Sequence, residues 1–371
     1  MQYAYAGVAR GCRHVSLKGA CLVAALLISA PVLADSSSGL SAYKSGQYAQ
    51  ALRQLTPAAR HGNAQAQWAL GSMYADGTGV TQDYAVAASW WQAAASQNQP
   101  DAEAGLAALL LAGKGVPEDA QAAYDLYRKA AAQGNVSAEI GLADIYTRGD
   151  GVPQDDLIAL QWLSKAAVQG NAVAQVRLGS NYANGQGVAQ DYAQAFNWYR
   201  LAAQQGNALG QLNVGLLYVY GLGVNKDSGL AARWLTKAAM QGDARAECLL
   251  GQMYLGGEGV VQNSRLALEL LQKASLQGDA SAQGTLAAMY LAGKAIKRDL
   301  QQAYVYASLA VMNDGDDAII RRDAIGAVLT PDRLGKAQAA TRDFVSQNPK
   351  AASSSDFALL DAADASGQLK Y

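Results

Sequence analysis

The chain repeats one unit of 36 residues seven times, from Gly62 to about Asn313. A period of about 20 to 50 residues indicates a solenoid, in which each unit packs only on its neighbours. The residue that opens each unit recurs without a slip, at Gly62, Asn98, Gly134, Gly170, Gly206, Gly242 and Gly278. Because such a stack presents a long surface rather than a pocket, the sequence favours a binding protein over an enzyme.

Each unit predicts two antiparallel helices, and the fourth unit shows why. Asn171 is a good N-cap, and Leu178 and Tyr182 are spaced four apart on one face, so a helix is predicted from about Ala172 to Ala183. A Gly-x-Gly-Val turn follows, and an Asp or Asn then precedes the second helix in every unit. These seven predicted N-caps are Asp83, Asp119, Asp155, Asp191, Asp227, Asn263 and Asp299.

The repeated motif is Leu-Gly-x-x-Tyr, Gly-x-Gly-Val, Asp-Tyr-x-x-Ala and Trp-Tyr-x-x-Ala-Ala. The fourth unit carries it at Leu178, Gly179, Tyr182, Gly185, Gly187, Val188, Asp191, Tyr192, Ala195, Trp198, Tyr199, Ala202 and Ala203. This pattern resembles the Sel1-like repeat family, a relative of the tetratricopeptide repeats. The resemblance implies an all-α fold, a right-handed α/α superhelix that serves as an adaptor for protein complexes. It also implies that helix A of each unit lines the concave face.

Five segments are expected along the chain. They are a signal peptide over residues 1–34, a divergent N-terminal helix pair over 35–61, the seven repeats over 62–313, C-terminal capping helices over 314–347, and a disordered tail over 348–371. The first segment has a positive start and then a short apolar stretch, Ala20–Ser29, too short to span a bilayer. With cleavage after Ala34, the protein is expected in the periplasm, with secretion as the alternative. If the first segment is not cleaved, the alternative is that it stays in place as a membrane anchor.

Charge argues against some partners. Cleavage after Ala34 removes three of the 29 basic residues and none of the 30 acidic ones, which leaves a net charge of −4. The remaining chain has no cluster of Lys and Arg, and neutralising phosphates requires one. We therefore expect no nucleic-acid partner and no stable membrane insertion after signal cleavage.

Residues that could act in catalysis or bind a metal are also scarce. Beyond residue 34 the chain keeps one histidine, His61, and one cysteine, Cys248, separated by five repeats. We expect Cys248 to be a buried free thiol, with an intermolecular disulfide as the alternative, and His61 to end a helix. The Gly-x-Gly turns follow helices and recur in the repeats, so they are interpreted as structural rather than phosphate-binding. No catalytic residue, metal site or cofactor is predicted.

The positions that differ between copies indicate where a partner binds. In the fifth unit every helix-A position expected on the concave face is large and apolar, and two valines of the fourth unit flank them. The six predicted partner-binding residues are Val173, Val176, Leu209, Leu212, Leu216 and Tyr220. They predict a groove for an apolar peptide or a partner helix. Packing of these side chains on one another, or a homodimer contact, are the alternatives. With a groove, Leu212→Asp should weaken partner binding and leave the melting temperature near normal.

The predicted function is a non-catalytic protein–protein scaffold in the bacterial cell envelope, as a monomer or weak homodimer with a protein partner. One alternative is a cell-wall or small-molecule ligand binder, or a hydrolase, that uses the same face. Its candidate polar residues are Asp101, Asp144 and Arg148, which are scattered over two repeats. Another alternative is a secreted effector that contacts a host protein.

Overall fold

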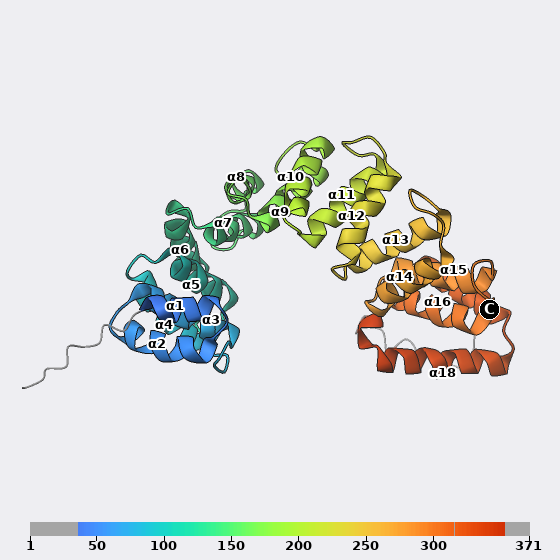
Figure 1. The fold of residues 1–371 in the computed structure, drawn as a ribbon, viewed down its shortest axis with the longest axis horizontal. Helices are drawn as coiled ribbons and strands as arrows, with labels where there is room; N and C mark the ends of the chain where they lie inside the picture. Colours follow the sequence, from blue (N-terminus) through green and yellow to red (C-terminus); the bar gives the residue numbers. More distant parts are fainter. Residues whose placement is uncertain (1–35, 315, 353–371) are drawn as a thin grey trace, which may run out of the picture.

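The computed structural model describes residues 36–314 and 316–352, and these form a curved stack of antiparallel helix pairs (Figure 1). Every regular element in these two ranges is helical. The chain runs along an arc, with the first and last helices at its two ends and the fourth and fifth repeats near its middle. The all-α solenoid predicted from the 36-residue period is confirmed. The predicted signal peptide lies outside the described residues.

Helix A and helix B alternate along the stack. The A helices of the seven repeats are α3 (Ala64–Asp76), α5 (Pro100–Ala112), α7 (Val136–Arg148), α9 (Ala172–Asn184), α11 (Ala208–Tyr220), α13 (Ala244–Gly256) and α15 (Ala280–Ala292). The B helices are α4 (Tyr84–Ala95), α6 (Ala120–Ala132), α8 (Asp156–Val168), α10 (Tyr192–Gln204), α12 (Ser228–Ala239), α14 (Ser264–Leu276) and α16 (Leu300–Asp314). Another pair, α1 (Ser36–Lys44) and α2 (Tyr48–Arg60), precedes them and packs on α3.

The predicted N-cap residues and the opening residues of the repeats have the conformations and contacts expected from the sequence. The Asp or Asn before each B helix accepts hydrogen bonds from backbone N–H groups in the first turn of that helix. At Asp191, for example, one carboxylate oxygen accepts from the N–H groups of Ala193 and Gln194 at 2.9 and 3.0 Å. The opening residue of every repeat has a positive φ. Six are glycine, and Asn98, at φ 60°, tolerates this region better than most residues.

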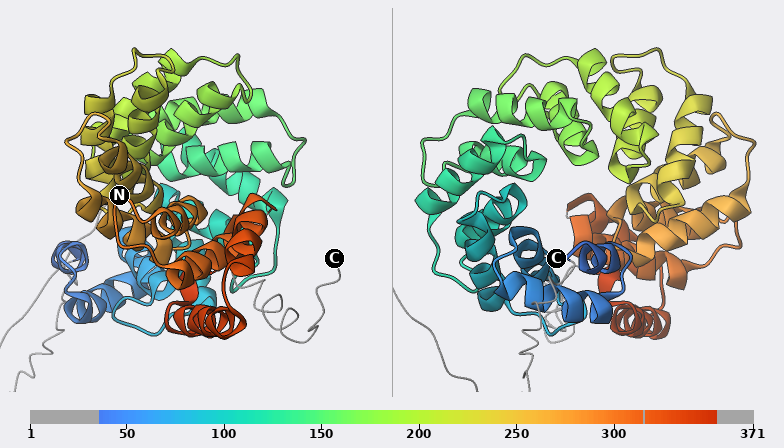
Figure 2. Two further views of the ribbon diagram at one scale, coloured as in Figure 1. Left: turned by 90° about the vertical axis from the view of Figure 1, so that its right-hand side faces the viewer. Right: turned by 60° about the vertical axis from the view of Figure 1, so that its left-hand side comes forward.

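The A helices lie on the inner side of the arc. Consecutive A helices contact each other in the pairs α3–α5, α5–α7, α9–α11 and α13–α15. Among the described residues, consecutive B helices do not make contacts this extensive. Because the A helices approach one another more closely than the B helices, the stack curves toward its A side, and Figure 2 shows this curvature in two further views.

A ladder of polar side chains runs through the repeats, with buried acceptors on the A helices. In each copy, a Gln or Glu of helix A accepts a hydrogen bond from an amide side chain 30 positions later, at or just past the end of helix B. The seven donor–acceptor pairs, with their distances, are Gln97–Gln67 (2.8 Å), Gln133–Glu103 (3.0 Å), Gln169–Glu139 (2.8 Å), Gln205–Gln175 (2.8 Å), Gln241–Gln211 (2.8 Å), Gln277–Glu247 (2.9 Å) and Asn313–Gln283 (3.0 Å).

Glutamate and glutamine differ in this ladder. Each of the four glutamines also donates from Nε2 to the backbone carbonyl eight residues earlier. An ionised glutamate has no proton for that carbonyl, and within the described chain Oε1 of the fully buried Glu103 has no hydrogen-bond partner. Burial raises the pKa of Glu103, Glu139 and Glu247, although a nearby lysine and the amide partner oppose the effect in each case.

The C-terminal segment closes the ladder. Helices α17 (Asp316–Ala327) and α18 (Pro331–Gln347) follow α16, and both pack against it. A short 3₁₀ helix, η1 (Pro349–Ala351), then brings the Ala351 carbonyl within 2.8 Å of Gln283 Nε2 and 2.9 Å of Asn313 Nδ2. The tail predicted from residue 348 therefore begins with a packed segment, because this carbonyl accepts hydrogen bonds from the side-chain amides of Gln283 and Asn313. Residues 353–371 lie outside the described residues.

Candidate partner-binding site

Four of the six predicted partner-binding residues reach the surface. Val173, Leu209 and Tyr220 are 54%, 49% and 62% exposed, and Leu216 is half-buried. Leu209, Leu216 and Tyr220 are spaced by seven and four residues, so they follow one side of α11. Val173 takes the same position on α9, one repeat earlier. These four residues, called the apolar strip below, form a surface of the kind that often marks an interaction site.

The other two predicted residues are core residues, which corrects the expectation that all six line an open groove. Leu212 is 3% exposed and packs between helices α12 and α13. Val176 is 4% exposed and packs against helices α10 and α11. Each lies three residues beyond an exposed member of the apolar strip, a rotation of about 60° on a helix. That rotation directs the side chain into the next repeat. The self-packing alternative therefore applies at these two positions, and a polar change at Leu212 would disturb the core.

A hollow of about 310 Å³ opens beside the apolar strip, between the third and fourth repeats. Its walls come from α7, α8 and α9, and Leu209 of α11 contributes to its lining. The lining side chains include Ala143, Thr147, Asp156, Ala159, Leu163, Val176, Arg177, Ser180, Asn181, Gln186 and Leu209. Its volume is at the lower end of the range of about 300–1,000 Å³ that is usual for ligand pockets. The sequence prediction named Val176 and Leu209 but missed the polar residues of this hollow.

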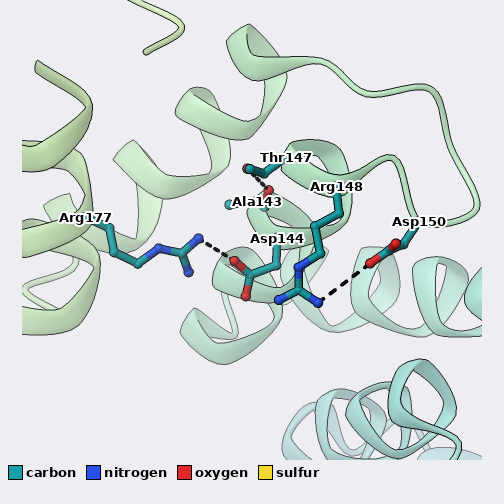
Figure 3. A network of polar contacts seen from close by, with 6 residues as sticks. All are labelled: Ala143, Asp144, Thr147, Arg148, Asp150 and Arg177. Carbon is teal, nitrogen blue, oxygen red and sulfur yellow. Dashed lines mark hydrogen bonds and ion pairs between the residues drawn. The ribbon is translucent and has the colours of Figure 1, made fainter. Parts of the chain in front are cut away.

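Figure 3 shows the charged residues Asp144, Arg148, Asp150 and Arg177, of which Arg177 lines the hollow. Arg177 of α9 forms an ion pair with Asp144 of α7, which links two consecutive A helices. Arg148 lies 3.8 Å from Asp150, on the side of Asp144 away from Arg177. Asp101, in contrast, accepts hydrogen bonds from Asn135 (2.7 Å) and Gln99 (3.3 Å) in another part of the stack. The three residues named for a hydrolase or ligand binder therefore do not converge on one point. Asp144 and Asp101 instead make contacts between repeats.

Cys248 and His61, the two side chains considered for catalysis, both lie in structural positions. Cys248 is a free thiol, as predicted, and burial raises its pKa to about 12, so it is not a ready nucleophile. His61 ends α2, as predicted, with Nδ1 2.7 Å from the Pro57 carbonyl. Over residues 36–314 and 316–352, no group of three or more His, Cys, Asp or Glu is arranged to hold a metal ion. In the same residues, none of the helices combines the length and apolar character needed to cross a membrane.

Comparison with known families agrees with the repeat pattern. The family model for the Sel1 repeat matches seven consecutive segments, at residues 64–99, 100–135, 136–171, 172–207, 208–243, 244–279 and 280–314. A Sel1 repeat protein from Oxalobacter formigenes has a similar structure, with a TM-score of 0.56 and 30% identity. This similarity covers 64% of the present chain and 96% of that protein.

Two further proteins are also similar to this chain, one with a lower structural similarity and the other over a short segment. A protective antigen of uropathogenic Escherichia coli with an SLR fold is 29% identical, with a TM-score of 0.40, over 91% of this chain and 88% of the antigen. An exopolysaccharide production negative regulator of Rhizobium leguminosarum bv. viciae is 51% identical over 45 residues. That match spans 12% of this chain and only 17% of the regulator, slightly more than one repeat.

Proposed function

Because the chain belongs to the Sel1 repeat family, whose members are protein-interaction scaffolds, we propose that it is a non-catalytic adaptor of the bacterial cell envelope. It binds a peptide or a helix of a partner protein on the inner face of the arc. The regulatory role of the Rhizobium protein is not carried over, since the match covers so little of that regulator. The proposed envelope location rests on the signal-peptide pattern of residues 1–34 and, once the signal is cleaved, the protein acts in the periplasm.

The apolar strip is the observation that carries this proposal. Three large apolar side chains, Val173, Leu209 and Tyr220, stand about half exposed or more on consecutive A helices. Leu216 joins them along α11. A solvated face would be expected to carry polar residues at these positions, whereas an amphipathic partner helix buries such a strip at evenly spaced anchor positions.

Photocrosslinking in cells tests the proposal. A photoreactive residue is placed at Leu209 in one variant and, as a control, at the exposed Lys237 of the B helix α12 in another. Adducts are then identified by mass spectrometry of the envelope fraction. We expect one partner protein to be crosslinked from Leu209 and not from Lys237, because only the first position lies on the apolar strip.

Three results would count against the proposal. Adducts of the chain with itself would indicate a homodimer contact. The absence of adducts at both positions would leave the apolar strip without a partner in the envelope. Equal labelling of many proteins from both positions would indicate contact without specificity.

A further inference from the structure

One position of the core breaks the pattern of the other repeats. Asn181 of α9 occupies a position that is large, apolar and buried in the remaining six copies. The equivalents are Met73, Leu109, Ile145, Leu217, Met253 and Met289, all at most 7% exposed. In the other copies this side chain fills the space against the B helix of the preceding repeat. At Asn181 no apolar side chain fills that space.

The hollow between the third and fourth repeats lies at this position. Asn181 lines it from α9, and Ala159 and Leu163 line it from α8, the preceding B helix. The apolar cluster at this junction contains Leu163 and Leu178 but no residue from the position of Asn181. A short polar side chain where the stack elsewhere places Met, Leu or Ile therefore leaves room for a group from outside the chain.

The polar groups in the hollow are suited to a positive charge. The side-chain amide of Asn181 and the carboxylate of Asp156 have no hydrogen-bond or ion-pair partner among the described residues. Arg177 is neutralised by Asp144. The hydroxyl groups of Thr147 and Ser180 donate to the carbonyls of Ala143 and Val176. The groups left for a ligand are thus the Asp156 carboxylate and the side-chain amides of Asn181 and Gln186, and the one uncompensated charge among these lining side chains is the negative charge of Asp156.

We propose that this hollow binds the cationic side chain, Lys or Arg, of a partner segment that lies along the apolar strip. Ala159, Leu163, Val176 and Leu209 supply apolar walls for the aliphatic stem of that side chain, and Asp156 and Asn181 receive its charged end. Leu209 lines the hollow and also belongs to the apolar strip, so one partner segment occupies both. This inference rests on the proposed adaptor function and adds the chemistry of one anchor residue.

Three short peptides test the inference by NMR. The full chain is labelled with ¹⁵N and titrated with acetylated and amidated Ala-Lys-Ala, Ala-Arg-Ala and Ala-norleucine-Ala. The side-chain amide signal of Asn181 is assigned by its loss in Asn181→Leu. We expect saturable shifts of this signal with at least one cationic peptide, and about tenfold weaker binding or none with norleucine, which keeps the stem and lacks the charge. The comparison of lysine with arginine identifies the preferred cation.

Variants separate the hollow from the rest of the surface. Asn181→Leu restores the residue found at Leu109 and Leu217, so it should fold, raise the melting temperature and abolish binding of the cationic peptides. Asp156→Asn should weaken binding about fivefold or more. Asp125→Asn, on an exposed position of α6, makes the same charge change away from the hollow and should leave binding unchanged.

The inference is overturned if norleucine binds as tightly as lysine and arginine, if no peptide gives a saturable shift, or if binding survives in Asn181→Leu. A partner crosslinked from Leu209, together with any of these results, would end the inference about the hollow and leave the adaptor function standing. Saturable binding of a cationic peptide without a crosslinked partner would support the hollow as a site for a cationic side chain and count against the adaptor function.

Discussion

Single positions decide which side chains of the fifth repeat face solvent. Leu209 and Leu212 are three residues apart on α11, and both are large and apolar. Leu209 is 49% exposed on the inner face, whereas Leu212 is 3% exposed against α12 and α13. Burial within the next repeat, rather than hydrophobicity, therefore separates a candidate binding residue from a core residue.

Alanine substitutions at these two positions should have different effects on stability. Leu212→Ala leaves a cavity in the core and should lower the free energy of unfolding by about 2–5 kcal/mol. Leu209→Ala removes a surface group and should change it by no more than about 0.5 kcal/mol. Urea denaturation followed by circular dichroism measures both. Equal losses for the two variants would show that Leu209 also belongs to the core and would remove it from the apolar strip.

At the scale of elements, the polar ladder connects each A helix to the end of the B helix in its own repeat. The ladder uses Gln in four repeats and Glu in three, with the same amide-to-oxygen hydrogen bond in all seven. The difference is the proton that Gln, or a neutral Glu, can donate to a backbone carbonyl. The three glutamate repeats should therefore be less stable when these side chains are ionised.

Glu103→Gln should stabilise the protein at pH 7, by about 1–3 kcal/mol, because it replaces a buried acceptor that lacks a partner. Burial raises the pKa of Glu103 in the folded state above its ordinary value of 4.5. The folded state therefore holds this proton more tightly than the unfolded state, and wild-type stability at this site increases as pH falls from the raised pKa toward 4.5. The advantage of Gln should accordingly shrink over that interval.

Urea denaturation of wild type and variant at pH 7 and near pH 4.5 provides the check. Glu118→Gln, at an exposed position before α6, is the matched control and should have little effect at either pH. An advantage of Glu103→Gln that stays constant with pH would mean that the carboxyl is not the group that titrates. A loss of stability at pH 7 would mean that the ionised form is favourable in the fold.

The sequence was sufficient to predict the helices, but it was not sufficient to predict which face of each helix is exposed. The helix pairs, their N-caps and the positive φ of the opening glycines repeat every 36 residues, so each is supported by up to seven observations. Val176 and Leu212 were misplaced because the identity of a residue does not show which side of its helix the next repeat covers. The hollow was missed because its signal in the sequence is a single replacement of a large apolar core residue by the smaller, polar Asn181. The equivalent position in the other six repeats is Met, Leu or Ile, and a comparison of each core position across the seven repeats would have identified Asn181.

At the scale of the whole molecule, departures from the repeat gather near the middle of the arc. The Arg177–Asp144 ion pair, Asn181 with its hollow, and the apolar strip all lie between α7 and α11. Because each unit of a solenoid packs mainly on its neighbours, a change in one repeat can alter the local surface without changing the fold elsewhere. This distribution supports one partner site in the central repeats rather than a surface used equally along its length.

Titration calorimetry tests that central claim most directly, with a synthetic peptide that copies the partner segment crosslinked from Leu209. The wild-type protein is compared with Tyr220→Ala and with Val261→Ala, which alters a more exposed apolar residue, 88% accessible, in a loop away from the apolar strip. Tyr220→Ala should weaken binding about tenfold or more, because it removes a large aromatic anchor, while Val261→Ala should bind like wild type. Equal affinities for all three proteins, or equal losses in both variants, would contradict a dedicated site on the inner face.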